Sequence, residues 1–302
     1  MILIRKKTAG KNLFPFMLVW LIFLLPDHAV FAAKSLTLPA KIWGICFGNS
    51  PRFNGLRFNI IDEKIEVING INITLWKSRD KKISGTVNGL SLGVIPYAAE
   101  LKGIQIGLLG SGAGDRVIGL NLGGLGMGAG ESVIGLNLGG LGMGAGENVI
   151  GLNFGGLGMG AGENVIGLNF GGLGVGAGEK VMGITIAGLG AGAGEKLIGL
   201  TISGLGAGAP TVVGLTIAGL GVGGNRITGV SLALGTIHIA EDGVYRGLAV
   251  SAFNYIKGTM KGVAIGIVNY AYRLKGLQIG LVNIVRDNPR GRVILPIINF
   301  NF

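Results

Sequence analysis

Glycine alternates with leucine, isoleucine, valine or asparagine over most of this chain, so apolar and small positions recur with a period of two. This period predicts β-strands, because amphipathic helices place apolar residues every three to four positions. Between residues 103 and 199 the pattern recurs at every sixteenth position, as in the unit that runs from Val117 to Glu131. One glycine fixes the frame of each unit: Gly103, Gly119, Gly135, Gly151, Gly167, Gly183 and Gly199, followed at a step one position shorter by Gly214 and Gly229.

Looser copies of the unit extend the array in both directions. They are centred on Gly55, Gly70 and Gly89 upstream and on Gly247, Gly262 and Gly276 downstream. An array of this kind is one stacked unit whose core lies between neighbouring repeats. The chain therefore divides into a leader (1–32), degenerate repeats (33–102), regular glycine-rich repeats (103–240), and further degenerate repeats with a terminal strand (241–302).

The leader has the order of a secretory signal peptide. Four basic residues (Arg5, Lys6, Lys7 and Lys11) precede an apolar run over residues 13–25, and small residues follow around Ala32. We expect cleavage after Ala32, with cleavage after Ala33 as the alternative. The run is short for a membrane span, which needs about 20 apolar residues.

The apolar side chains change parity inside each unit, at the pair Gly123-Gly124. A bend there brings six apolar side chains to one side of the sheet and leaves Val117 and Asn121 on the other. The six predicted inward residues are Ile118, Leu120, Leu122, Leu125, Met127 and Ala129.

Two all-β architectures satisfy this pattern. In a β-solenoid the coils stack in parallel, and Asn121, Asn137, Asn153 and Asn169 form a column that continues with Thr185, Thr201, Thr216 and Ser231. In an antiparallel meander closed into an outer-membrane β-barrel, Glu131, Glu147 and Glu163 lie at alternate ends, which avoids a column of like charges. The alternating segment that ends in Phe302 resembles the terminal strand of such barrels, although it contains Pro296. We take the solenoid as the prediction and the barrel as the alternative.

The segments Lys261-Gly-Val-Ala-Ile-Gly-Ile-Val-Asn269 and Lys275-Gly-Leu-Gln-Ile-Gly-Leu-Val-Asn-Ile284 resemble the recurring unit of bacterial surface repeat-containing proteins of the Leptospira and Bacteroides type. The resemblance covers about two thirds of the chain after the leader. It implies export and a position in the cell envelope, and it brings no catalytic residues. The Gly-Leu-Gly-Met-Gly-Ala-Gly half-units contain more glycine than that family pattern.

Candidate chemistry is sparse. Cys46 is the single cysteine, so no intrachain disulfide forms, and its apolar surroundings predict a buried thiol. His238 lies on an alternating strand and is expected to be an ordinary strand residue. The acidic groups Asp62, Glu63 and Glu66, and Glu241-Asp242, are expected to solvate turns. The Glu-Asn turns supply one carboxylate per unit, too few for a tight Ca²⁺ site.

Two short motifs do not indicate a function. The segment Gly124-Leu-Gly-Met-Gly-Ala129 matches a degenerate dinucleotide fingerprint, but a strand is expected where a helix is needed. Asn72-Ile-Thr74 is a glycosylation sequon of a kind that arises often by chance.

The sequence therefore predicts no catalytic, cofactor-binding or metal-binding residues. The net charge is +11, but the basic residues lie mostly outside the regular repeats and no aromatic platform accompanies them, which argues against nucleic-acid binding. We expect an exported, non-enzymatic structural or adhesive element of the Gram-negative envelope, with an outer-membrane pore as the alternative. The expected partners are envelope components and further copies of the chain, and no small-molecule substrate is identified.

Overall fold

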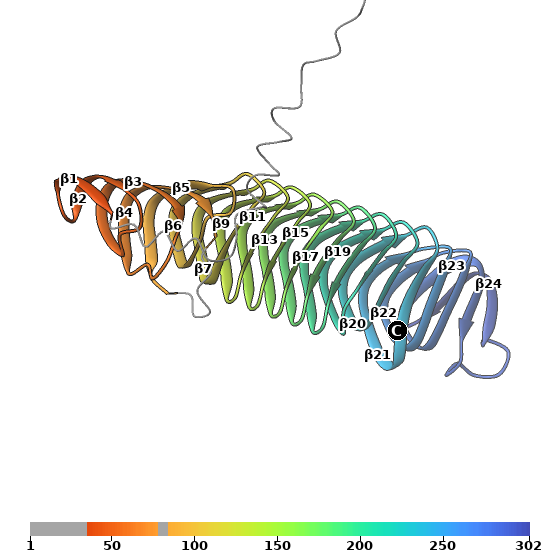
Figure 1. Cartoon of the computed structure of the whole chain (residues 1–302). Coiled ribbons are helices and arrows are strands. Elements are labelled where there is room, and N and C mark those ends of the chain that lie inside the picture. Colours follow the sequence, from red (N-terminus) through yellow and green to blue (C-terminus); the bar gives the residue numbers. More distant parts are fainter. Residues whose placement is uncertain (1–34, 78–83) are drawn as a thin grey trace, which may run out of the picture. The chain divides into compact units, whose positions relative to one another are not determined.

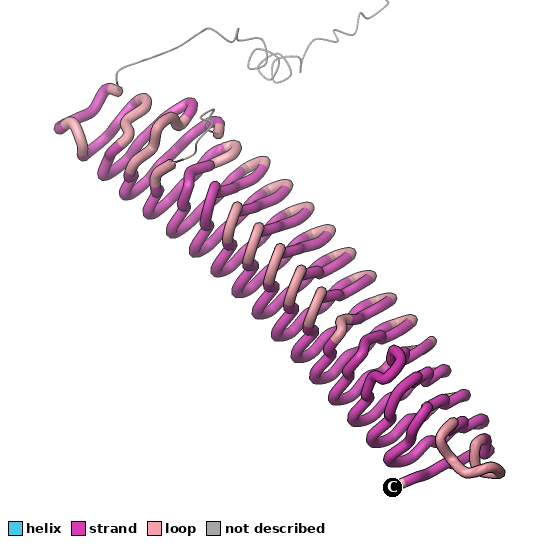
Figure 2. Tube along the Cα trace, turned by 90° about the horizontal axis from the view of Figure 1, so that it is seen from below, coloured by secondary structure: helices cyan, strands magenta, loops and turns pink. Residues whose placement is uncertain are grey.

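The computed structural model describes residues 35–77 and 84–302, so the predicted leader (1–32) lies outside the described residues. The unit Ser35–Phe302 is a stack of coils (Figure 1) in which every element among the described residues is a β-strand. The same order of strand and corner recurs from coil to coil (Figure 2).

The strands fall into three groups along the stack. At the N-terminal end most coils have one long strand: β1 (Leu36–Ala40), β2 (Trp43–Phe47), β3 (Arg52–Ile61), β4 (Val67–Trp76), β5 (Thr86–Gly93), β6 (Tyr97–Gly107) and β7 (Gly110–Gly123). The regular repeats alternate short and long strands: β8 (Gly126–Ala129), β9 (Ser132–Gly139), β10 (Gly142–Ala145), β11 (Asn148–Gly155), β12 (Gly158–Ala161), β13 (Asn164–Gly171), β14 (Gly174–Ala177), β15 (Lys180–Ala187), β16 (Gly190–Ala193), β17 (Lys196–Ser203), β18 (Gly206–Gly208) and β19 (Thr211–Ala218). The last group is β20 (Gly221–Ala233), β21 (Thr236–Val250), β22 (Phe253–Ile265), β23 (Val268–Val285) and β24 (Ile294–Asn301).

Each coil pairs in parallel with the coil before it, one repeat away. In β9 and β11, for example, Asn137 pairs with Asn153 and Gly135 with Gly151. Successive glutamates lie on one edge of the stack, since the backbone N–H of Glu147 donates to the carbonyl of Glu131 at 2.8 Å. The predicted β-solenoid is therefore confirmed, and the antiparallel alternative is wrong.

A column of glycines runs through the middle of the long strands, and we call its members the framing glycines. Their φ angles lie between 108° and 143°, a region that L-residues rarely adopt. A Cβ placed on Gly135 would lie 2.0 Å from the carbonyl oxygen of Gly119 in the preceding coil. Among the described residues the column has sixteen members: Gly44, Gly55, Gly70, Gly89, Gly103, Gly119, Gly135, Gly151, Gly167, Gly183, Gly199, Gly214, Gly229, Gly247, Gly262 and Gly276. The repeat pattern predicts fifteen of these levels and misses Gly44.

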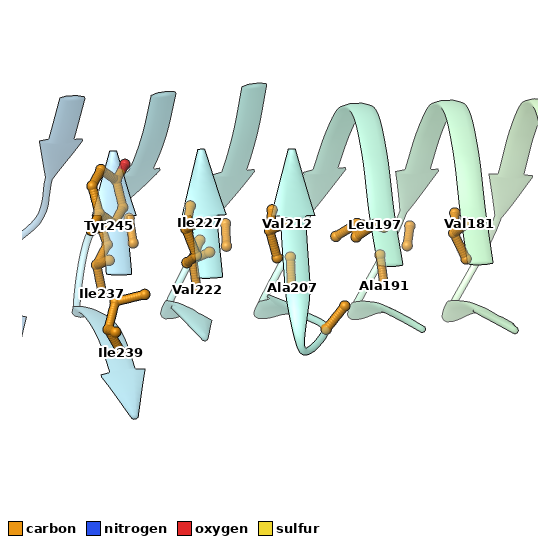
Figure 3. Close-up of a cluster of buried hydrophobic side chains, with 14 of the residues drawn as sticks. Val181, Ala191, Leu197, Ala207, Val212, Val222, Ile227, Ile237, Ile239 and Tyr245 are labelled. Carbon is orange, nitrogen blue, oxygen red and sulfur yellow. The ribbon is translucent and has the colours of Figure 1, made fainter. Parts of the chain in front are cut away.

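The core lies between the long and short strands of each coil. Val181, Leu197 and Val212 form one buried column, and Ala191 and Ala207 form a column that faces it (Figure 3). In the regular repeats the inward residues are mostly valine, asparagine, threonine, alanine, glycine and methionine, and Leu197 is also buried.

The predicted inside and outside of the unit are wrong for the long strand and the corner, and right for the short strand, where Met127 is buried and Ala129 packs against the core. Leu120 and Leu122 are predicted inside, but in β7 they alternate with the buried residues and point outward. Leu125, also predicted inside, is 52% exposed. Val117 and Asn121, expected outside, are fully buried, and Met127 alone of the four residues Leu120, Leu122, Leu125 and Met127 is buried.

The coil is too thin to hold more side chains, which explains the inversion. At the corner, a Cβ on Gly123 would lie 2.2 Å from the carbonyl oxygen of Gly126, so the chain returns close against itself. The strand keeps its alternation up to this corner, and Gly123 takes the inward position. No parity change takes place within the strand, so the leucines stay outside.

Antiparallel strands close both ends of the stack. β1 pairs antiparallel with β2, and β24 pairs antiparallel with β23. Each closing strand contains a proline, Pro39 or Pro296, which removes one backbone N–H from the outer edge. The alternation before Phe302, which resembled a barrel strand, belongs to this closing strand.

Candidate interaction surface

Two outward columns cover the long strands, and together we call them the apolar face. They consist of the residues one and three positions after each framing glycine, and they run from Ile45 and Phe47 to Leu277 and Ile279. Every residue in both columns is aliphatic or phenylalanine. In the middle of the array Leu152 is 41% exposed and Phe154 is 37% exposed. A continuous apolar surface thus lies outside the molecule, although the repeat pattern predicted these side chains in the core.

The polar counterpart of this surface is a column inside the coil, two positions after each framing glycine. Asn121 donates to Asn137 at 2.6 Å, Asn137 to Asn153 at 2.7 Å and Asn153 to Asn169 at 2.8 Å, and all four side chains are fully buried. The same column continues through Thr185, Thr201, Thr216 and Ser231, as predicted. Buried amides must be paired, and here the first three donate to their copy in the next coil while Asn169 donates to Thr185 at 3.4 Å. Because this polar column must stay inside, the residues one and three positions after each framing glycine point outward.

A ridge of leucines follows the corner next to the apolar face. Leu125, Leu141, Leu157 and Leu173 occupy equivalent positions and are each at least half exposed. Beside it a shallow groove has a glycine floor, and its walls include Ile106, Leu122 and Leu138.

The column one position before the framing glycines borders the apolar face, and we call it the border column. It begins with Trp43 and is then polar at Asn54, Asn69 and Asn88, basic at Lys102, and apolar from Ile118 to Val213. After Thr228 it is basic at Arg246, Lys261 and Lys275. The two ends of the border column therefore differ in charge.

The glutamate edge is a column of exposed carboxylates. Glu131, Glu147 and Glu163 are all exposed, and Arg116 lies 3.8 Å from Glu131. Hydrogen bonding to Lys102, aided by Arg116, lowers the pKa of the Glu100 carboxyl near this edge. Within residues 35–77 and 84–302, no group of three His, Cys, Asp or Glu side chains is arranged to hold a metal.

One acidic residue predicted to solvate a turn is instead buried. Asp62 is 1% exposed and accepts a hydrogen bond from Arg57 Nη1 at 2.5 Å, and Arg57 also donates to Asn72 at 2.8 Å. Glu63 is exposed as predicted, and exposed Glu66 pairs with Arg52. The structure needs Asp62 because Arg57 occupies the interior column, where an unpaired charge is costly. The asparagine of the sequon is the same buried Asn72, so its amide is not accessible.

Cys46 and His238 take the places that the sequence predicts. Cys46 is fully buried in the interior column, and desolvation raises the pKa of its thiol despite the nearby Arg57. His238 is exposed on β21, with its ring 5.5 Å from that of Tyr255. Exposed Glu241 pairs with Lys257 at 3.3 Å, and Asp242 beside it is also exposed.

The degenerate fingerprint at residues 124–129 lies at the corner and on strand β8, and β9 follows it. This is the geometry of a solenoid coil and lacks the helix start that holds a pyrophosphate. The part of the chain that the structure describes has no helix long and apolar enough to cross a membrane.

The comparisons with known proteins add no functional assignment. No protein-family model, no curated protein and no solved structure matches the chain. Inference about function therefore depends on the surfaces described above.

Proposed function

We propose that this chain is an exported, non-enzymatic β-repeat protein of the Gram-negative cell envelope that works as a structural or adhesive surface element. The apolar face carries this proposal. Two unbroken outward columns over sixteen levels present one repeated chemistry along a rigid scaffold, which suits contact with an extended surface. Monomeric soluble proteins rarely expose a contiguous apolar patch of this extent.

The candidate chemical groups support the same function. Arg57 and Asp62 are used in a buried ion pair, Cys46 is buried, and the ring of His238 lies against a tyrosine. Cys46, Arg57 and Asp62 are neighbours in the N-terminal coils and are buried, whereas His238 lies on β21 in the C-terminal coils. Export is supported by the order of charged, apolar and small residues before Ala33.

Fractionation of cells that express the native chain tests the proposal. We expect the protein in the envelope fraction, with an N-terminus near Ala33 when that material is sequenced. A cytoplasmic protein that begins at Met1 would contradict both the export and the envelope position. A variant with Leu18→Arg and Leu21→Arg in the leader is the matched control, and it should remain in the cytoplasm because charges interrupt the apolar run.

A further inference from the structure

The apolar face is large enough for a stable protein interface. Its sixteen levels, spaced at about 4.8 Å, give a length of roughly 70 Å, and the strand segment across the face is about 13 Å wide. The product is about 900 Å² per chain, whereas a standard interface buries about 800 Å² on each partner. The exposed side chains are aliphatic and aromatic, which is typical of the fully buried centre of an interface.

We propose that the apolar face binds the apolar face of a second copy of this chain, with the two stacks antiparallel. A second copy has the same spacing between coils, so the columns of both chains stay in step over the whole length of the contact. An interface with twofold symmetry uses the same patch on both partners. The twofold axis lies in the plane of the contact and runs parallel to the strands, across the stack. Each column then meets the same column of the second copy, which runs in the opposite direction. This proposal does not depend on export or on a position in the envelope.

The phenylalanines locate the twofold axis. Eight framing glycines precede the midpoint of the column and eight follow it, and the two central levels are Gly151 and Gly167. Phe154 and Phe170 follow these two glycines, and their rings stack with centroids 4.7 Å apart. An axis between these levels brings four phenylalanine rings together at the centre of the contact. Aromatic residues at the centre are the usual hot spots of interfaces.

The border column favours the antiparallel orientation. With this axis, Arg246 meets Asn69, Lys261 meets Asn54, and Lys275 meets Trp43 of the second copy. A basic side chain beside an exposed indole such as Trp43 gains a cation–π contact. In a parallel dimer the axis runs along the stack, so every basic residue lies at the level of its own copy, and the two basic ends repel each other. The pattern of asparagine at one end and basic residues at the other therefore suits antiparallel stacking.

The closing strands at the two ends of the stack favour association through the apolar face. β1 and β24 cover the terminal coils, and each carries a proline. Strand addition at the ends is therefore opposed, whereas nothing in the described residues covers the apolar face.

Sedimentation velocity over a range of concentrations tests the dimer. We expect a species with twice the mass of one chain. In the dimer, Phe154→Glu places one carboxylate from each chain at the centre of the contact. This change should raise the dimer dissociation constant by roughly 100-fold or more. The matched control is Gly176→Glu, in the next coil and on the short strand β14, where an added Cβ meets no atom within 4 Å. This control should leave the dissociation constant unchanged, and circular dichroism should show that both variants keep their strands.

Asn54→Glu tests the orientation. In the antiparallel dimer the new carboxylate faces Lys261 of the second copy, so the dissociation constant should fall about threefold to tenfold at low salt and return to its original value at high salt. In a parallel dimer the same change places two carboxylates at one level and weakens association. The neutral variant Asn54→Gln should change neither result.

Weaker association of Asn54→Glu would overturn the antiparallel orientation, and two further outcomes would overturn the dimer through the apolar face. One is a chain that remains monomeric at every concentration; if Phe154→Glu then abolishes its binding to phospholipid vesicles, the apolar face binds a membrane instead. The other is a dimer that resists Phe154→Glu but dissociates with Gly176→Glu, which would place the contact on the short strands.

Discussion

At the residue scale, glycine has two different roles in this chain. The framing glycines hold a backbone conformation and a close approach that only glycine permits. Among the outward glycines of the short strands, Gly144, Gly160, Gly176 and Gly192 have neither constraint. The same outward columns carry His238 and Tyr255 in the C-terminal coils, which shows that this scaffold accepts large side chains there.

We therefore expect opposite results from two Gly→Ala changes in neighbouring strands. Gly135→Ala forces φ near 124° on alanine and places a Cβ 2.0 Å from a carbonyl oxygen. This change should destabilise the fold by about 3 kcal/mol or more. The added Cβ of Gly144→Ala meets its nearest atom at 3.7 Å, so the free energy of unfolding should change by less than about 1 kcal/mol. Urea denaturation of both variants measures this difference, and equal losses would show that the framing glycines have no special conformation.

Tyr245 gives the fold a dependence on alkaline pH. Burial raises the pKa of its phenol to about 12, while an unfolded phenol ionises near a pH of about 10. Between these values the folded chain holds the proton and the unfolded chain releases it, so stability falls as the pH rises from about 10 through 12. At about pH 11.5 the loss should be about 2 kcal/mol relative to neutral pH. Tyr245→Phe should remove this part of the pH dependence; an unchanged dependence would mean that other groups cause it.

At the scale of the strand, the sequence predicts how the coils stack and which residues are equivalent. It does not predict which side chains of the long strand point into the core. The repeat period, the framing glycines and the asparagine column all follow from spacing, because parallel coils bring equivalent residues together. The parity argument failed because it assumed that leucine is always buried. Val149, Asn153 and Met159 lie inside this coil and Leu152 and Leu157 lie outside, whereas Leu197, at the position equivalent to Val149, is buried. Composition alone does not reveal the width of a coil, and the outward apolar face was missed for the same reason.

The asparagine ladder can be tested within one strand. Asn137→Leu removes the side-chain acceptor of the Asn121 amide and the side-chain donor to Asn153, two buried hydrogen bonds. The loss of these hydrogen bonds should cost about 2 kcal/mol. Asn169→Thr should cost less than about 1 kcal/mol, because Thr185 already follows Asn169 in the column and the change moves that boundary by one coil. Thermal unfolding of both variants compares them, and a milder effect of Asn137→Leu than of Asn169→Thr would mean that the ladder does not stabilise the coil.

At the scale of the whole unit Ser35–Phe302, the two ends of the stack and the apolar face have different roles. The closing strands oppose the addition of further chains at the ends, and the apolar face remains available for contact with a second copy. Deleting residues 292–302 should expose the edge of β23 and produce large species in light scattering, since open strand edges pair with other chains. Deleting Phe302 alone is the control, because this residue is 95% exposed and follows the last paired position. A truncated chain that stays the size of the parent would show that the cap has no protective role.

The central claim is that each coil of the regular repeats keeps the positions two before and two after its framing glycine inside and leaves the leucines next to the framing glycine and at the corner outside. Thiol accessibility tests this claim most directly. In a Cys46→Ala background, Leu157→Cys and Val149→Cys differ in one predicted property, since Leu157 is 52% exposed and Val149 is fully buried. The structure predicts that a maleimide modifies Leu157→Cys at least roughly 100-fold faster under native conditions, because the buried thiol reacts only after local opening. Equal rates, or faster reaction of Val149→Cys, would contradict this claim.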